Sequence, residues 1–289
     1  MNRLDLPVQA AFLAATLLLA APAATAQQRS PAPLAAAAPE FAYADLADLA
    51  DAAALVLRAQ VREVSRLPPE QARGLRPGMA RVFVKARTRA VLTGETLGES
   101  VSYLADVPLD ARNRMPKLSK REVLLFARPV EGRPGELQLV APDAQLEWSL
   151  PLEARVRTIL GELVASGAAP PVIAVREAAH VAGNLLGEGE TQIFLTTASG
   201  DPVSISVLRR PGAEPTWGVA FGEIVDQAAQ PPARETLAWY RLACFLPGVL
   251  PAGAILAGDD EGRAAADDYR WMRAQLGACP RTRPPEWRR

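Results

Sequence analysis

Apolar and polar residues alternate along two long stretches of the chain, residues 55–62 and 80–91. A period of two predicts β-strands with one face in a core and the other in water. In the second stretch Val82 and Val84 share the inner face, whereas Phe83 lies on the outer face among basic residues. A short helical pattern that begins at Tyr43 precedes the first strand.

Further strands are predicted at residues 100–107 and 121–130, followed by a shorter pair at 135–142 and 145–150. Residues 151–167 change to a helical period, with an apolar stripe after Pro151 and a glycine past the end. Antiparallel strands with a helix on each side are typical of a small closed barrel of the OB type. The predicted fold class is therefore mainly β with α (α+β), with an OB-like antiparallel barrel at residues 42–167.

The order of these elements resembles the TIMP-like (netrin-module) OB-fold domains of exported bacterial proteins. The matching residues are Val91-Leu92-Thr93-Gly94, which close the second strand, and Leu124-Leu125-Phe126 in a later one. Thr93 stands where such domains usually have lysine, and the cysteines that staple the animal members are missing. Because animal inhibitors of this type act through a cysteine-anchored N-terminus, the resemblance raises protease inhibition as a function without supplying its anchor.

A second unit is predicted over residues 171–280, after a linker at 168–170. Strands are expected at 171–183 and 216–225, and residues 190–210 form a hairpin around a Ser199-Gly200-Asp201 turn. The period then becomes helical and predicts a pair of helices, the second running from Asp259 to Gly277. Residues 281–289 are expected to be a flexible tail.

Cys244 and Cys279 are the only cysteines, and each lies on the apolar face of a predicted helix. Two cysteines cannot supply a four-ligand zinc site, so in an oxidising compartment a disulfide between them is expected. Both lie near the C-terminal ends of their helices, and a connecting segment that runs back along the first helix can bring them together. Two buried free thiols are the alternative.

The N-terminus has the pattern of a secretory signal peptide over residues 1–26, with Arg3, an apolar run and small residues at Ala24 and Ala26. The run is shorter than the about 20 residues of a membrane-spanning helix, and no later segment is long enough. Residues 27–41 are rich in proline and alanine and predict a flexible leader. A periplasmic or secreted protein without a transmembrane segment after cleavage is therefore expected.

The sequence lacks the motifs of several functional classes. Formal net charge is zero, no P-loop or nucleophile elbow is present, and no cofactor or nucleic-acid partner is expected. His180, the single histidine, precedes Glu188 and Glu190 across a predicted hairpin. A carboxylate-oriented imidazole can act as a general base, so a hydrolase-like site near these residues is one hypothesis. A surface histidine and a solvated strand face are the alternative.

A basic outer face of the barrel is the second candidate site. Its members are Arg58, Arg62, Arg81, Lys85, Arg87 and Arg89. Such a face can dock an anionic envelope polymer or an envelope protein, or it can be a solvated face whose charges are offset by acidic neighbours. Since the architecture carries no catalytic constellation, the predicted function is an exported non-enzymatic binding or assembly protein of the bacterial cell envelope. The hydrolase-like enzyme remains the alternative.

Overall fold

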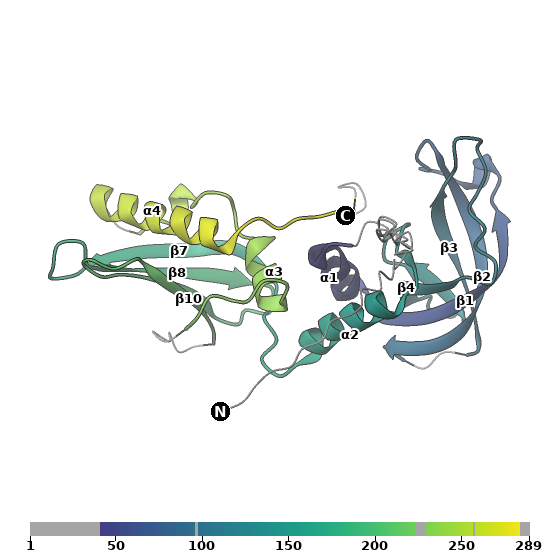
Figure 1. The fold of residues 1–289 in the computed structure, drawn as a ribbon, viewed down its shortest axis with the longest axis horizontal. Coiled ribbons are helices and arrows are strands. Elements are labelled where there is room, and N and C mark those ends of the chain that lie inside the picture. The colour runs from purple at the N-terminus through teal and green to yellow at the C-terminus, as the bar shows by residue number, and fades with distance from the viewer. Residues whose placement is uncertain (1–40, 96–97, 223–228, 257, 284–289) are drawn as a thin grey trace, which may run out of the picture. The chain divides into compact units, whose positions relative to one another are not determined.

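The computed structural model describes residues 41–95, 98–222, 229–256 and 258–283. The expected signal peptide lies outside these residues. Within them, the chain forms a closed five-stranded barrel, a separate four-stranded antiparallel sheet and a long C-terminal helix (Figure 1). The predicted fold class is confirmed. None of the helices in these ranges is long and apolar enough to cross a membrane.

Five strands close the barrel in the order β1-β2-β3-β5-β4-β1, in which only β3 and β5 are parallel. This order agrees with the predicted OB-like barrel. The strands are β1 (Leu55–Arg66), β2 (Met79–Thr93), β3 (Ser100–Pro108), β4 (Glu122–Pro129) and β5 (Glu136–Leu139). The short strand β6 (Gln145–Glu147) pairs with residues 123–125 of β4, on the same edge of β4 as β5. The two short strands therefore do not pair with each other, since both pair with β4.

The alternation along β2 decides which side chains fill the barrel. Val82 and Val84 are fully buried, whereas Lys85, the next residue along the strand, is exposed. Shifts of register between β1 and β2, such as the one between Val61 and Glu63, mark bulges that let these long strands bend. Gly94 ends β2 with a φ of 98°, and a Cβ there would lie 2.6 Å from the carbonyl oxygen of Ala54. Only glycine fits that close approach.

Two helices flank the barrel, α1 (Tyr43–Ala52) and α2 (Leu150–Val164). The predicted apolar stripe of α2 is buried at Leu152, Val156, Ile159 and Leu160. Ser149 caps this helix by accepting a hydrogen bond from the backbone N–H of Leu152 at 3.3 Å. Two single-turn 3-10 helices, at Pro69–Gln71 and Ala252–Ala254, lie in connecting segments.

The second sheet has the order β10-β9-β8-β7, and every neighbouring pair is antiparallel. Its strands are β7 (Val172–Ala182), β8 (Gly189–Thr197), β9 (Val203–Arg209) and β10 (Thr216–Phe221). The predicted hairpin is formed by β8 and β9. Helix α4 (Asp259–Leu276) lies along this sheet and buries Tyr269 and Met272 completely (Figure 1).

The expected disulfide is confirmed, since Cys244 is bonded to Cys279 with their Cα atoms 5.1 Å apart. Cys244 directly follows helix α3 (Leu237–Ala243). The connecting segment reaches β7, where the backbone N–H of Leu256 donates to Ala178 at 3.1 Å. The sequence did not predict this contact of the connecting segment with the sheet. By the chain-entropy estimate, a crosslink over 35 residues adds about 4 kcal/mol of stability.

Helix α1 uses a face of three aspartates to hold segments from the end of the chain. Tyr240 donates its hydroxyl proton to Asp48 at 2.6 Å. Arg241 forms two hydrogen bonds to the carboxylate of Asp51, at 2.7 and 2.8 Å, while its own side chain is only 4% exposed. The guanidinium also donates to the carbonyl of Ala169, so the predicted linker at 168–170 takes part in this contact.

The third aspartate, Asp45, binds the end of the chain. Its Oδ2 accepts the backbone N–H of Thr282 at 2.5 Å and that of Arg283 at 3.0 Å. Arg283 in turn binds Asp143 through two hydrogen bonds and is 4% exposed. Residues 281–283, which belong to the segment predicted as a flexible tail, are therefore held by α1 and Asp143, and the rest of that segment lies outside the described residues.

Replacing Asp51 with alanine should lower the free energy of unfolding by about 3 kcal/mol, because it leaves the buried guanidinium of Arg241 without its anion. Asp267→Ala is the matched control, since Asp267 pairs with Arg270 on the surface and should change stability by less than about 0.5 kcal/mol. Urea unfolding of the two variants measures both values. Equal losses in the two variants would show that burial of the pair has no energetic consequence.

All four tyrosines of the chain should ionise late in the folded protein. Burial raises the pKa of each, to about 12 for Tyr269, whose hydroxyl donates to the carbonyl of Pro247. Because the folded state favours the neutral phenol, its stabilisation is complete below pH about 10 and falls as the pH rises toward 12. Tyrosinate absorbance of the native protein should stay flat near pH 10, where urea-unfolded protein titrates. A native titration near pH 10 would contradict the burial.

Candidate functional site

The outer face of β2 and β3 brings together side chains that are far apart in the sequence. Because side chains alternate along each strand, every second residue of β2 and of β3 points away from the core. The register sets the outward residues directly opposite one another as the pairs Arg81–Asp106, Phe83–Leu104 and Lys85–Ser102. On the other side of β3, Ser102 lies opposite Glu136 of β5.

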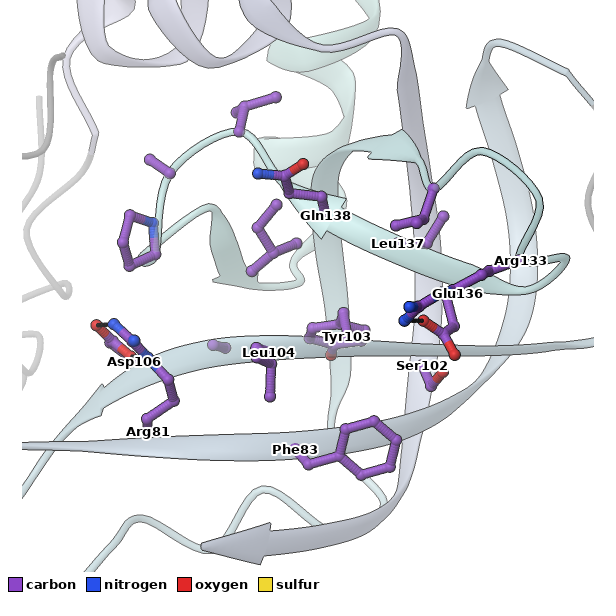
Figure 2. Close-up of a pocket in the computed structure, with 16 residues that line it drawn as sticks. Arg81, Phe83, Ser102, Tyr103, Leu104, Asp106, Arg133, Glu136, Leu137 and Gln138 are labelled. Carbon is purple, nitrogen blue, oxygen red and sulfur yellow. Dashed lines mark hydrogen bonds and ion pairs between the residues drawn. The ribbon is translucent and has the colours of Figure 1, made fainter. Parts of the chain in front are cut away.

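A cavity of about 750 Å³ lies on this face, between β3 and the segment from Val130 to Pro142 (Figure 2). We call it the outer groove. Its lining is formed by Arg81, Phe83, Ser102, Tyr103, Leu104, Ala105, Asp106, Val130, Arg133 and residues 136–142. A volume of this size lies within the range of small-ligand sites, about 300–1,000 Å³.

An ion pair lies at each end of the outer groove, as Figure 2 shows. Arg81 donates two hydrogen bonds to Asp106, at 2.7 and 2.8 Å, and the Asp106 side chain is only 5% exposed. These hydrogen bonds raise the pKa of Arg81 above its ordinary value. At the other end, Arg133 donates to Glu136 at 3.1 Å. The four charged groups thus neutralise one another in pairs.

The middle of the outer groove is apolar and open to solvent. Phe83 is 36% exposed and Leu104 46% exposed, although both belong to well-formed strands. Tyr103 lies behind them, buried, with its hydroxyl donating to Gln145 at 2.6 Å. Within the described part of the chain, the side chain of Gln138 on the rim forms no hydrogen bond.

Five of the six basic residues predicted as a binding face are paired with carboxylates. Lys85 pairs with Glu63 at 2.9 Å, and Arg87 with Glu99 at 3.5 Å. Of the six, only Arg81 lines the outer groove. Among the described residues, Arg62 alone of this set forms no ion pair.

Arg58 and Arg89 share one carboxylate, that of Glu122, at 3.7 and 3.9 Å. Arg58 also lies 4.8 Å from the ring centroid of Trp148 and 3.6 Å from Glu153. On this barrel face, basic side chains alternate with acidic ones, so little net positive potential is left to attract a polyanion.

His180 is not a surface histidine, which corrects that interpretation of the sequence. Its side chain is 10% exposed and lies between β7 and helix α4. Thr191 donates its hydroxyl proton to Asp268 at 2.5 Å. The Thr191 hydroxyl oxygen lies 2.8 Å from His180 Nδ1, and since its proton is already used, His180 Nδ1 is the donor to Thr191. Asp268 is fully buried and also accepts a hydrogen bond from Arg209.

The structure does not bring Glu188 or Glu190 to the imidazole of His180. Glu188 instead folds back over the β7–β8 turn, where its Oε2 accepts the backbone N–H groups of Asn184 and Leu185 at 3.1 and 3.2 Å. Glu190 accepts a hydrogen bond from Gln192. In the described ranges, no cluster of three or more histidine, cysteine, aspartate or glutamate side chains is arranged to hold a metal ion.

The sequence contained a signal for the outer groove that was not recognised. Residues 100–107 alternate with Val101, Tyr103 and Ala105 inward, which places an apolar residue, Leu104, on the outer face, as Phe83 is on the neighbouring strand. The partners of His180 carry no comparable signal, because Asp268 lies 77 residues beyond Thr191.

Comparison with family models and with curated proteins finds no match to this chain. The function is therefore inferred from the geometry of the two sites.

Thr191→Val should lower the free energy of unfolding by about 1–3 kcal/mol, since it leaves buried polar groups of His180 and Asp268 without a partner. Thr196→Val on the same strand is the matched control, because Thr196 is exposed and a β-branched residue is retained. Thermal and urea unfolding compare the two variants. If Thr191→Val were as stable as Thr196→Val, the polar cluster would not stabilise the packing of α4 on the sheet.

Proposed function

We propose that this protein is an exported, non-enzymatic binding protein of the bacterial cell envelope that holds its ligand in the outer groove. The observation that supports this most directly is the exposed pair of Phe83 and Leu104 between two ion pairs. Well-formed strands ordinarily turn such residues inward, and an apolar surface framed by fixed polar groups is typical of binding sites. Ligands of OB-type barrels bind on the face of the second and third strands, which is the face of this groove.

Binding has more support than catalysis because the only histidine takes part in a buried structural hydrogen-bond network. His180 Nδ1 is used by Thr191, and Thr191 is fully buried, so neither group is placed to attack a substrate. The hydrolase-like alternative would need Glu188 beside the imidazole, whereas that carboxylate caps a turn.

Export is supported by the N-terminal sequence pattern and by the disulfide between Cys244 and Cys279, which persists in oxidising compartments. The TIMP-like resemblance remains part of the proposal at the level of the barrel. Protease inhibition has no further support, because the barrel contains no cysteine to anchor an inhibitory N-terminus.

Photo-crosslinking in the producing cells tests the location of binding without assuming the ligand. A benzophenone amino acid inserts into C–H bonds of sugars, lipids and proteins alike, and position 83 is exposed enough to accommodate its additional benzoyl group. We expect an adduct from position 83, because the ligand contacts that ring. Position 164 on α2 is the matched control, since Val164 is 77% exposed but lies outside the groove.

The β7–β8 turn provides the competing site, because Leu186 is fully exposed there. An adduct at position 186 with none at 83 would contradict binding in the outer groove. Equal yields at 83 and 164 would mean that the crosslinks report random collisions and would contradict it as well.

A further inference from the structure

We infer that the ligand of the outer groove is a neutral oligosaccharide. The inference rests on the proposed function and names the chemical class that this groove recognises. It follows from the charge of the groove, from the closure of the barrel and from the nature of the groups left free in its lining.

Charge disfavours an anionic ligand. The groove contains two arginines and two carboxylates, and each arginine is already bonded to a carboxylate. A polyanion would have to displace Asp106 from Arg81, although that carboxylate is 5% exposed and held by two hydrogen bonds. Sites for nucleic acids and other polyanions instead present unpaired positive charge and several stacking aromatic rings.

Closure of the barrel disfavours an extended peptide. Peptides commonly bind to sheets by adding a strand to a free edge, where backbone N–H and C=O groups are available. Strand β3 is paired with β2 on one side, while on the other side β5 pairs with Ser102 and Tyr103, and the backbone N–H of Asp106 donates to Pro142. The β3 edge left at the groove is therefore too short to receive an added strand of several residues.

The size of the apolar centre disfavours a protein surface. Stable protein interfaces bury about 800 Å² on each partner around a cluster of anchoring residues. Here the exposed apolar centre consists of Phe83 and Leu104, and charged pairs bound it at both ends (Figure 2). That area is suited to one or a few small units.

A sugar chain matches each of these groups. The C–H face of a pyranose ring is apolar and can cover Phe83 and Leu104, and its hydroxyl groups both donate and accept hydrogen bonds. Gln138 offers an amide that can do the same. Glu136, whose side chain is 48% exposed, has lone pairs beyond the one that Arg133 uses, so it can accept sugar hydroxyls while the ion pair stays intact.

Isothermal titration of the chain from residue 27 onward tests this class directly. The probes are hexamers of α-1,4-linked glucose, β-1,4-linked glucose and β-1,4-linked N-acetylglucosamine. We expect at least one of them to bind, Phe83→Ala to weaken that binding at least tenfold, and Gln138→Ala to weaken it severalfold. Val164→Ala is the control and should bind like the unaltered protein. Circular dichroism establishes that each variant is folded.

Failure of all three hexamers would overturn the inference, and so would binding that Phe83→Ala leaves unchanged. Binding of polyphosphate that weakens with salt would overturn the charge argument. The crosslinked adduct at position 83 separates this inference from the proposed function. An adduct with mass increments of hexose or N-acetylhexosamine supports both; an adduct that protease digests keeps the binding function and overturns the sugar class; no adduct overturns both.

Discussion

Closure of the barrel between β1 and β4 is the constraint on which the functional face depends. β1 pairs with β2 along one edge and with β4, from Leu55 opposite Ala127 to Gln60 opposite Glu122, along the other. In a closed ring each strand has a fixed inner and outer face, so the register of the strands determines whether each residue points inward or outward. Val82 and Val84 then fill the core, and Phe83 between them has to face out. Closure also leaves only a short stretch of unpaired strand edge on β3, because β5 pairs with it at Ser102 and Tyr103.

Internal pairing of charges is the second organising feature. The chain has equal numbers of acidic and basic residues, 32 of each, and the structure uses many of them against one another. Arg81 with Asp106 frames the outer groove, and Arg241 with Asp51 holds α3 against α1. Both are doubly hydrogen-bonded pairs of the kind that fixes geometry. A groove whose charges are satisfied within the protein selects ligands by shape and by neutral hydrogen bonds.

The elements that could be predicted from the sequence are those with a local cause. Alternation over residues 80–91 predicted β2, and the apolar stripe after Pro151 predicted α2. The disulfide followed from the cysteine count and the expected compartment, although the path of its connecting segment did not, because that path depends on contact with Ala178 of another element.

The candidate sites were harder to predict because they depend on register and on distant partners. The pairing of the basic residues with acidic side chains depends on carboxylates from other strands, such as Glu122. His180 has the sequence context of a half-exposed strand, and its burial comes from α4 through Asp268. Phe83 and Leu104 lie opposite each other because of the register between β2 and β3, and the alternation of apolar and polar residues within each strand does not determine that register.

Methyl and aromatic side-chain NMR of the chain from residue 27 onward, recorded with and without the neutral polysaccharide fraction of the producing cells, tests the central claim most directly. The outer groove and the competing apolar turn are reported separately by Leu104 and by Leu185 and Leu186 of the β7–β8 turn. The account predicts that the largest shifts occur at the Leu104 methyl groups, the Phe83 ring and the Gln138 side-chain amide. Shifts confined to Leu185 and Leu186, with none at Leu104, would contradict it.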